Sequence, residues 1–229
     1  MDINNDTIYK KLVGKSLLKK KVYKTTIEIF QEFKMVADLV RFEADSRLTS
    51  DGHPIRVEFR DKGEFEAELR FAGDTLVFNM HTNVFEFSRV HDVMKTQYVK
   101  DDPQRSYCGV INIFNFLTDS FKYNRMNDAG YLVARVFVNK EKFFLVEGKH
   151  QNAFYYNQFM GFPIDQQSMR KIIEAAMSYS LDFDLLVPPY DLVKETTVAD
   201  VLENSVFMKT KTAKRMGFKF QADHDQQKN

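Results

Sequence analysis

The sequence predicts an α+β protein: an antiparallel meander of about eight strands, strongly bent or closed into a barrel or split barrel, with helices from both ends of the chain packed on it. Apolar and charged residues alternate with a period of two in the middle of the chain, most clearly over 64–71. Before residue 47 and after residue 163 the apolar period is helical. The chain also has 22 Phe and 10 Tyr but no Trp, and such rings pack well on a pleated sheet.

Length and composition indicate one folded domain, because 229 residues of which 44% are hydrophobic supply enough apolar surface for a continuous core. We expect a single domain over 1–220 and a disordered tail over 221–229. The domain divides into an N-terminal helical region, a β core and a C-terminal helical region, at 1–47, 54–150 and 163–216. Because the sequence shows no apolar signal segment and no run of 18 apolar residues, we expect a cytoplasmic protein without a membrane partner.

The lysine-rich start is expected to form a short helix and a connector. On a helical wheel, the apolar residues of 10–24 scatter among lysines, so one continuous helix would offer a membrane no apolar stripe. With Asp6 as N-cap and Gly14 in the left-handed stop position, a short helix regains an ordered apolar arc, and 15–24 becomes the connector.

The next helix is expected over 26–44, because Thr25 and Glu28 have the spacing of a capping box. Six apolar residues form its core face: Ile29, Phe30, Phe33, Val36, Ala37 and Val40. Four others lie off that stripe: Ile27, Met35, Leu39 and Phe42. We therefore expect a second covered surface, either against another helix or in a homo-oligomer.

The middle of the chain is expected to form consecutive strands separated by turn residues. The expected strands are 55–60, 64–71, 75–80, 84–88, 93–99, 107–116, 130–138 and 143–147. No helix long enough for a parallel crossover lies between them, so the sheet should be antiparallel. Eight twisted strands favour a barrel or half-closed barrel.

After Pro163 the helical period returns, with Asp165 as N-cap. One face of this helix is apolar and should pack on the sheet: Met169, Ile172, Ile173, Ala176, Tyr179 and Ser180. A last helix is expected over 198–212, capped by Thr197.

Few motifs of catalysis or cofactor binding are present. The five histidines lie in different elements without the spacing of zinc ligands, and glycine-rich phosphate loops and the nucleophile elbow are missing from the sequence. The single Cys108 excludes an internal disulfide and is expected to be a small buried residue. The sequence therefore favours a non-enzymatic protein without metal or cofactor, although residues distant in sequence can still converge.

Two polar segments are candidates for a ligand site, the loop 118–128 and the strand end 147–152. Their candidate residues are Asp119, Lys122, Tyr123, Arg125, Lys149 and His150. The more ordinary interpretation, a capped surface turn whose charges pair with each other, is favoured for both.

Positive charge is concentrated at the two ends of the chain, although the net charge is only +1. Residues 1–34 carry eight Lys against four acids, and residues 205–229 carry six Lys or Arg against two acids. The candidate nucleic-acid contacts are Lys10, Lys11, Lys15, Lys19, Lys20, Lys21, Lys24, Lys211, Lys214 and Arg215. The competing interpretation is a solvated face that keeps the protein soluble.

Three functions remain open from the sequence. The first is a cytoplasmic binding or regulatory protein whose basic ends contact nucleic acid, RNA rather than specific DNA, or an acidic protein. The second is a split-barrel protein that holds a flavin, a nucleotide or another small ligand. The third is a structural or assembly subunit, suggested by the second apolar surface of helix 26–44.

Overall fold

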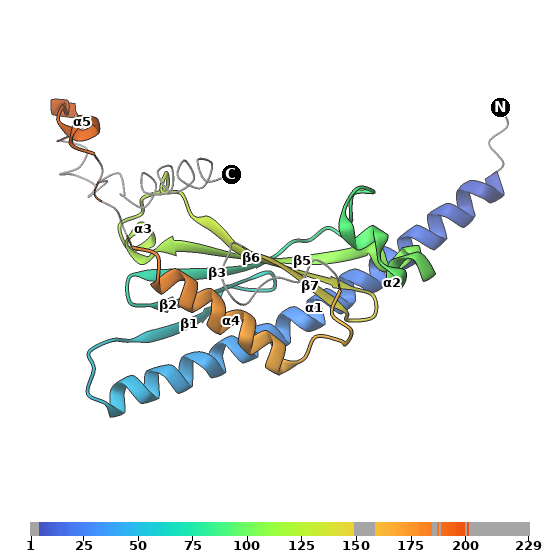
Figure 1. The fold of residues 1–229 in the computed structure, drawn as a ribbon, viewed down its shortest axis with the longest axis horizontal. Coiled ribbons are helices and arrows are strands. Elements are labelled where there is room, and N and C mark those ends of the chain that lie inside the picture. The colour runs from blue at the N-terminus through green and yellow to red at the C-terminus, as the bar shows by residue number, and fades with distance from the viewer. Residues whose placement is uncertain (1–4, 149–158, 185–186, 188, 200, 202–229) are drawn as a thin grey trace.

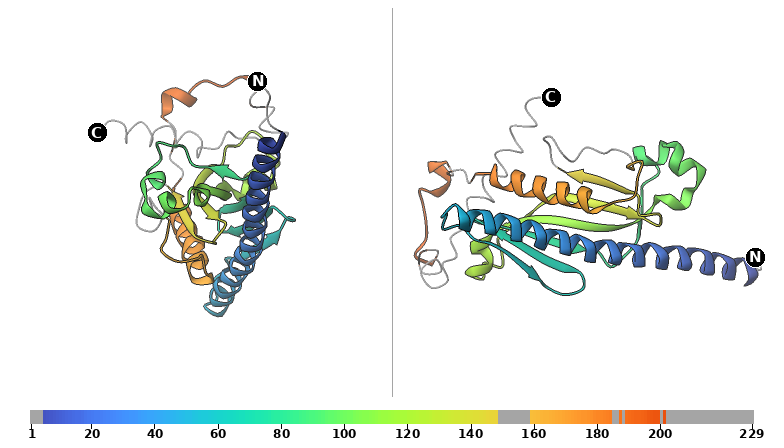
Figure 2. Two further views of the ribbon diagram at one scale, coloured as in Figure 1. Left: turned by 90° about the vertical axis from the view of Figure 1, so that its right-hand side faces the viewer. Right: turned by 90° about the horizontal axis from the view of Figure 1, so that it is seen from below.

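The computed structural model describes residues 5–148, 159–184, 187, 189–199 and 201. It shows an α+β fold in which one long helix, α1 (Asn5–Ser50), lies along one face of an antiparallel sheet (Figure 1). A second helix, α4 (Gln166–Leu181), lies beside α1 on that face. The views in Figure 2 show α1 extending well beyond the sheet at its N-terminal end.

Helix α1 is a single helix of 46 residues, so three predictions about this region are wrong. Gly14 does not stop it, Asp6 lies inside it, and Thr25 starts no new helix. A glycine inside a helix costs only about 1 kcal/mol relative to alanine, and the Leu and Lys residues around Gly14 favour the helix. Thr26 is buried in mid-helix, where its hydroxyl donates to the Val22 carbonyl at 2.8 Å.

The C-terminal end of α1 has the glycine stop that was expected at Gly14. Gly52 adopts φ 75°, and the amide of His53 donates to the Leu48 carbonyl at 2.9 Å. This is the pattern of a Schellman cap, in which glycine takes the left-handed position after the last turn. The helix therefore continues six residues past the expected end at 44.

The described residues contain seven strands: β1 (Val57–Asp61), β2 (Glu66–Phe71), β3 (Asp74–Met80), β4 (Phe85–Glu86), β5 (Tyr107–Leu117), β6 (Tyr131–Asn139) and β7 (Phe144–Gly148). Their order is β1-β2-β3-β5-β6-β7, with β4 pairing the start of β5, and every pair is antiparallel. The predicted antiparallel sheet is confirmed. Since β1 and β7 stand at opposite ends of this order, the described sheet is open, and the expected barrel is not confirmed.

The strand expected at 93–99 is wrong. Asp92–Lys95 is a turn of 3-10 helix, followed by α2 (Gln97–Asp101) and a second 3-10 turn, Pro103–Ser106. Two caps favour these turns, because the Val93 amide donates to His91 Nδ1 and the Gln104 amide to Asp102. The apolar residues that suggested a strand, Val93 and Val99, instead join a second small core.

The main core lies between the sheet and the two helices. The predicted face of α1 is buried there, and the Phe33 ring meets the Phe78 ring edge-on at 5.5 Å. At Gly109 the backbone of β5 comes so close to α1 that an added Cβ would lie 2.1 Å from Thr26 Oγ1. Glycine is required at this position because any side chain would push helix and sheet apart.

The helix after Pro163 is confirmed. Asp165 Oδ1 accepts the Ser168 amide at 2.8 Å, and five of the predicted face residues are buried: Met169, Ile172, Ile173, Ala176 and Ser180. Arg170 contacts both carboxylate oxygens of Glu43 at 2.7 and 2.8 Å, which joins α4 to α1. Among the described residues, no helix combines the length and apolar character needed to cross a membrane.

Two short helices complete the described chain, α3 (Thr118–Lys122) and α5 (Tyr190–Val193). The helix expected from residue 198 begins there, since the Val201 amide donates to the Thr197 carbonyl at 3.1 Å. Its remainder and the expected tail 221–229 lie outside the described residues.

Candidate functional site

The N-terminal part of α1 leaves the sheet because its core stripe changes chemistry. Leu18 and Val22 are the first buried residues of that stripe. Continued toward the N-terminus by three and seven residues from Leu18, the same stripe falls on Lys15 and Lys11. Burying an unpaired ammonium group costs several kcal/mol, so the helix cannot pack there. Residues 5–17, called the arm from here on, therefore project past the sheet (Figure 1).

The arm and the turn that follows it carry a high density of positive charge. Seven lysines lie within residues 10–24, and Asp6 is the one acid over residues 5–24. Asp6 pairs with Lys10 at 2.7 Å, where both side chains are largely exposed. Such an exposed pair contributes little to stability. The other six lysines are also exposed, so most of the lysine charge faces solvent.

Three of these lysines form a row along the body side of the helix. Lys11, Lys15 and Lys19 are spaced at i, i+4 and i+8, which places neighbouring side chains about 6 Å apart. All three are exposed. The row is about 12 Å long, since a helix rises about 1.5 Å per residue.

The row ends at a shallow open hollow between α1 and the connection from β3 to β4. Three residues of α1 line it, Lys19, Lys20 and Tyr23, together with the connecting residues Thr82, Asn83 and Val84. Two ammonium groups, one aromatic ring and two polar side chains thus surround one hollow. This combination suits a phosphate group followed by a planar ring.

One lysine of the row, Lys15, lies near the start of β5. Burial raises the pKa of the Tyr107 hydroxyl, and the Glu86 carboxylate beside it raises that pKa further, whereas Lys15 lowers it in part. The ammonium group of Lys15 therefore lies within reach of Tyr107, although the Lys15 side chain stays exposed.

The loop 118–128, the first predicted ligand segment, is held together largely by its own charges. The guanidinium of Arg125 is 10% exposed and lies 3.4 Å from Asp128 and 3.9 Å from Asp119. The Ser120 hydroxyl donates to Asp128 at 2.6 Å, and Lys122 lies over the Tyr123 ring at 5.0 Å. These contacts are those of a capped surface turn, and a ligand role for this loop stays a prediction.

Five predicted site residues lie outside the described residues: Lys149, His150, Lys211, Lys214 and Arg215. The structure therefore places the seven predicted site lysines of 10–24 in α1 and brings Lys19 and Lys20 together with Tyr23 at the hollow. Whether the two basic ends form one surface stays a prediction.

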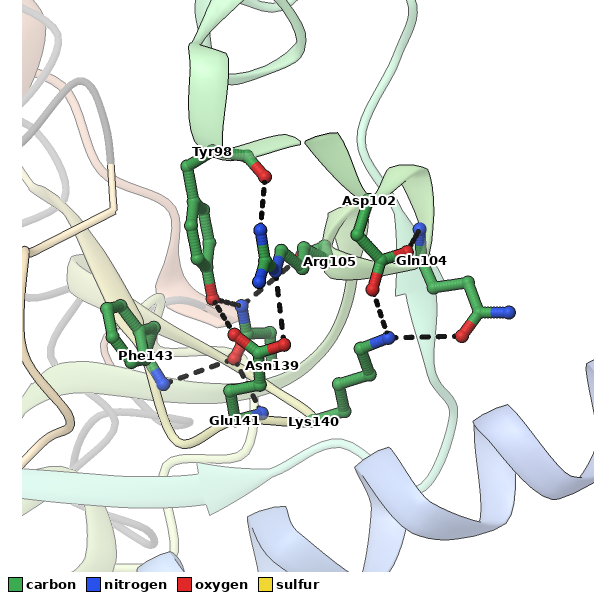
Figure 3. A network of polar contacts seen from close by, with 8 residues as sticks. All are labelled: Tyr98, Asp102, Gln104, Arg105, Asn139, Lys140, Glu141 and Phe143. Atoms are coloured by element: carbon green, nitrogen blue, oxygen red, sulfur yellow. Dashed lines mark hydrogen bonds and ion pairs between the residues drawn. The ribbon is translucent and has the colours of Figure 1, made fainter. Parts of the chain in front are cut away.

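A network of polar contacts around Glu141 was not predicted from the sequence (Figure 3). Glu141 accepts from the Tyr98 hydroxyl at 2.8 Å and from Arg105 Nε at 3.1 Å. Asn139 donates to the Tyr98 hydroxyl at 2.9 Å, and Lys140 donates to Asp102 at 2.5 Å. The residues come from 98–105 and from the turn between β6 and β7, which only the fold brings together.

This network fixes the segment 92–106 to the sheet. Burial alone would raise the pKa of Glu141, but the hydrogen bonds from Tyr98 and Arg105 lower it overall. Burial is also the main cause that raises the pKa of Tyr98. The polar groups of the network form hydrogen bonds and ion pairs with one another. The arrangement is therefore suited to holding two segments together rather than to proton transfer.

Neither a metal site nor a known relative guides the assignment. Within the described ranges, no three His, Cys, Asp or Glu side chains are grouped so as to hold a metal ion. Cys108 is buried, and burial raises the pKa of its thiol well above the ordinary value, which disfavours a nucleophile. No family model, no curated protein and no solved structure matches this chain.

Proposed function

We propose that this chain is a cytoplasmic, non-enzymatic binding protein that holds the phosphate backbone of RNA along the lysine row of α1. One observation carries the proposal: Lys11 and Lys15 continue the helix stripe whose buried residues, from Leu18 to Val40, are mainly apolar. Lysine at these two positions both prevents packing and leaves a rigid, exposed cationic surface.

The expected mode of binding is electrostatic and insensitive to base sequence. Lysines that neutralise phosphates release condensed counterions, so affinity falls steeply with salt. Residues 5–24 contain no arginine, the residue that most often reads base edges. Tyr23 beside the hollow offers one ring on which an unpaired base can stack, which favours single-stranded RNA over duplex DNA.

An acidic protein partner is the competing candidate, because a row of carboxylates would meet the same lysines. A row of carboxylates would not stack on the Tyr23 ring at the end of the lysine row, whereas an unpaired base would, and for this reason we favour RNA. The flavin or nucleotide alternative depended on a barrel mouth, and the described open sheet gives it no support.

The test is fluorescence anisotropy of a labelled single-stranded RNA of about 20 nucleotides, titrated with protein from about 0.05 to 0.3 M salt. A variant with Lys11→Gln, Lys15→Gln and Lys19→Gln should bind about 100-fold more weakly at about 0.1 M salt, since each lost phosphate contact costs about fivefold. The slope of log affinity against log salt should become about 2 units shallower.

The matched control replaces three exposed lysines elsewhere, Lys95→Gln, Lys100→Gln and Lys171→Gln, with the same change of net charge. The control should bind as the wild type does. Equal loss in both variants, or binding that ignores salt, would contradict the proposal. Tighter binding to polyglutamate than to RNA would instead support an acidic protein partner.

A further inference from the structure

The side of α1 that faces away from the sheet is apolar at both ends. On the arm, Tyr9, Val13 and Leu17 are exposed, with Leu17 at 62%. On the packed part, Met35, Leu39 and Phe42 are exposed, with Met35 at 61% and Phe42 at 58%. Spacings of three and four residues place each group on one side of the helix, and the two groups share that side.

Charged residues of opposite sign lie between the two apolar groups. Lys20 and Lys24 follow the first group, and Glu28 and Glu32 precede the second. The residues that carry this pattern, called the outer face, are Tyr9, Val13, Leu17, Lys20, Lys24, Glu28, Glu32, Met35, Leu39 and Phe42, and the exposed Lys10, Lys21 and Gln31 lie among them. Along the helix the outer face reads apolar, basic, acidic, apolar.

This order is self-complementary when reversed about residue 26. An antiparallel second helix centred there sets Lys24 opposite Glu28 and Lys20 opposite Glu32. It also sets Leu17 opposite Met35 and Val13 opposite Leu39, each apolar residue facing an apolar one. From these matches we propose that the chain forms a two-fold symmetric dimer in which the outer faces of two α1 helices pack antiparallel.

The symmetry of the pairing closes the assembly at two copies. Each contact occurs twice, since the same surface serves both copies. A parallel pair would set Lys20 against Lys20 and Glu32 against Glu32, so the charges select the antiparallel arrangement. The matched contacts would extend over about 40 Å, because the matched positions run from residue 13 to residue 39 and a helix rises about 1.5 Å per residue.

The four charged residues of the outer face are accessible to a second copy of the chain. Lys20, Lys24 and Glu28 are exposed, and Glu32 is partly exposed. Glu28 lies 3.9 Å from Lys142 in its own chain, but 47% of its side chain stays exposed. Exposed ion pairs contribute little to affinity, so here they mainly set orientation and register while the apolar residues supply affinity.

The dimer leaves the lysine row uncovered. Lys11, Lys15 and Lys19 lie on the body side of α1, opposite the outer face. The dimer therefore covers none of the three lysines of the row, and only Lys20, which lines the hollow, also belongs to the outer face. In the dimer, the arm that overhangs its own sheet lies against the packed part of the second copy's helix.

The first experiment measures mass by light scattering during size exclusion. Wild type should have twice the 26.9 kDa of one chain. The variants Lys20→Glu with Lys24→Glu, and Glu28→Lys with Glu32→Lys, should each raise the dimer dissociation constant at least about 10-fold, because all four ion pairs become repulsive. An equal mixture of the two variants should return to dimers, since every pair is then opposite in sign.

Three results would overturn the proposed dimer: a monomeric wild type, a dimer that both variants leave intact, or a mixture of the two variants that fails to form dimers again. Circular dichroism of each variant checks that it folds, and no substituted residue lies in the core. The variant with all four substitutions should dimerise by itself, which would show that loss of the dimer in the double variants comes from charge.

The second experiment tests the register with a short bis-maleimide cross-linker. Leu17→Cys mixed with Met35→Cys should cross-link, whereas neither variant alone should, because like positions lie about 27 Å apart in the antiparallel pair. The native thiol of Cys108 is buried and does not compete. Cross-linking of Leu17→Cys with itself would point to a parallel pair and overturn the register.

Discussion

The arm and the packed part of α1 have the same backbone conformation but opposite surroundings. Both belong to one helix, and both are rich in leucine, valine and lysine. In the packed part the stripe toward the sheet carries residues such as Val22, Ile29 and Phe33, whereas in the arm it carries Lys11 and Lys15. Helix propensity is therefore enough to keep the arm helical, whereas the chemistry of the stripe toward the sheet determines which part of α1 is buried.

The largest expected difference between the two parts comes from deleting one large side chain in each. Phe33→Ala should lower the free energy of unfolding by about 3 to 5 kcal/mol, because it leaves a cavity beside Phe78 in the main core. Leu12→Ala, on the exposed arm, should change it by less than about 0.5 kcal/mol. Chemical denaturation of both variants checks the pair. Equal effects would mean that the arm is also packed in solution.

The contact between α1 and β5 gives the next effect. Gly109→Ala should destabilise the fold by about 1 to 3 kcal/mol, because the new methyl group would meet Thr26. In a Thr26→Ala background the cost should be smaller but not zero, since the clashing Oγ1 and Cγ2 are gone while the Cβ at 2.7 Å remains. A double-mutant cycle in urea measures this coupling. Additive effects would show that helix and sheet approach less closely than described.

The smallest expected effect comes from removing the acidic partner of a lysine, which we compare for buried Lys34 of the packed part and exposed Lys10 of the arm. Lys34 is 5% exposed, and its ammonium group donates to Asp61 at 2.8 Å and to the Gly63 carbonyl. The hydrogen bond from Lys34 to Asp61, and a second one that Asp61 accepts from the Gly63 amide, lower the pKa of Asp61 below its ordinary value. The stabilisation is therefore present above about pH 4 and is lost as the pH falls further.

Asp61→Asn should accordingly cost about 0.5 to 1 kcal/mol at neutral pH and flatten the loss of stability below about pH 4, the magnitude being limited by the exposure of Asp61. Asp6→Asn removes the corresponding partner of Lys10 on the arm, where both groups are exposed, and should have no measurable effect. Thermal unfolding of the variants from about pH 3 to 7 makes the comparison. An unchanged pH dependence in Asp61→Asn would contradict the assigned pair.

Periodicity predicted the elements that span several turns or a full strand. The buried face of α1, the helix capped by Asp165 and the long strands β3, β5 and β6 are all found near their expected bounds. Short signals were less dependable. Gly14 and the capping-box pattern at Thr25 both looked like helix boundaries. The Leu and Lys residues around Gly14 favour the helix enough to outweigh the glycine, and tertiary packing on either side of Thr26 outweighs the capping-box pattern.

The candidate sites were predictable only in part, for a similar reason. The lysines of 10–24 are visible in the sequence, but their division into a lysine row and an outer face requires one continuous helix through Gly14. The network around Glu141 joins residues about forty positions apart in sequence and has no local pattern. Tyr98 lies in the segment 93–99 that was expected to be a strand, and Arg105 lies beyond that segment.

The order of α1 and the elements that cover it along the chain has a consequence for synthesis. Helix α1 is made before the sheet and α4, so the surfaces that cover its apolar stripe are completed only by β7 and α4, and its ion pair between Glu43 and Arg170 spans 127 positions. Contacts of such long sequence separation form late and slow folding. A nascent chain thus carries an uncovered amphipathic helix until α4 has emerged, and aggregation and chaperone binding are most favoured during that stage.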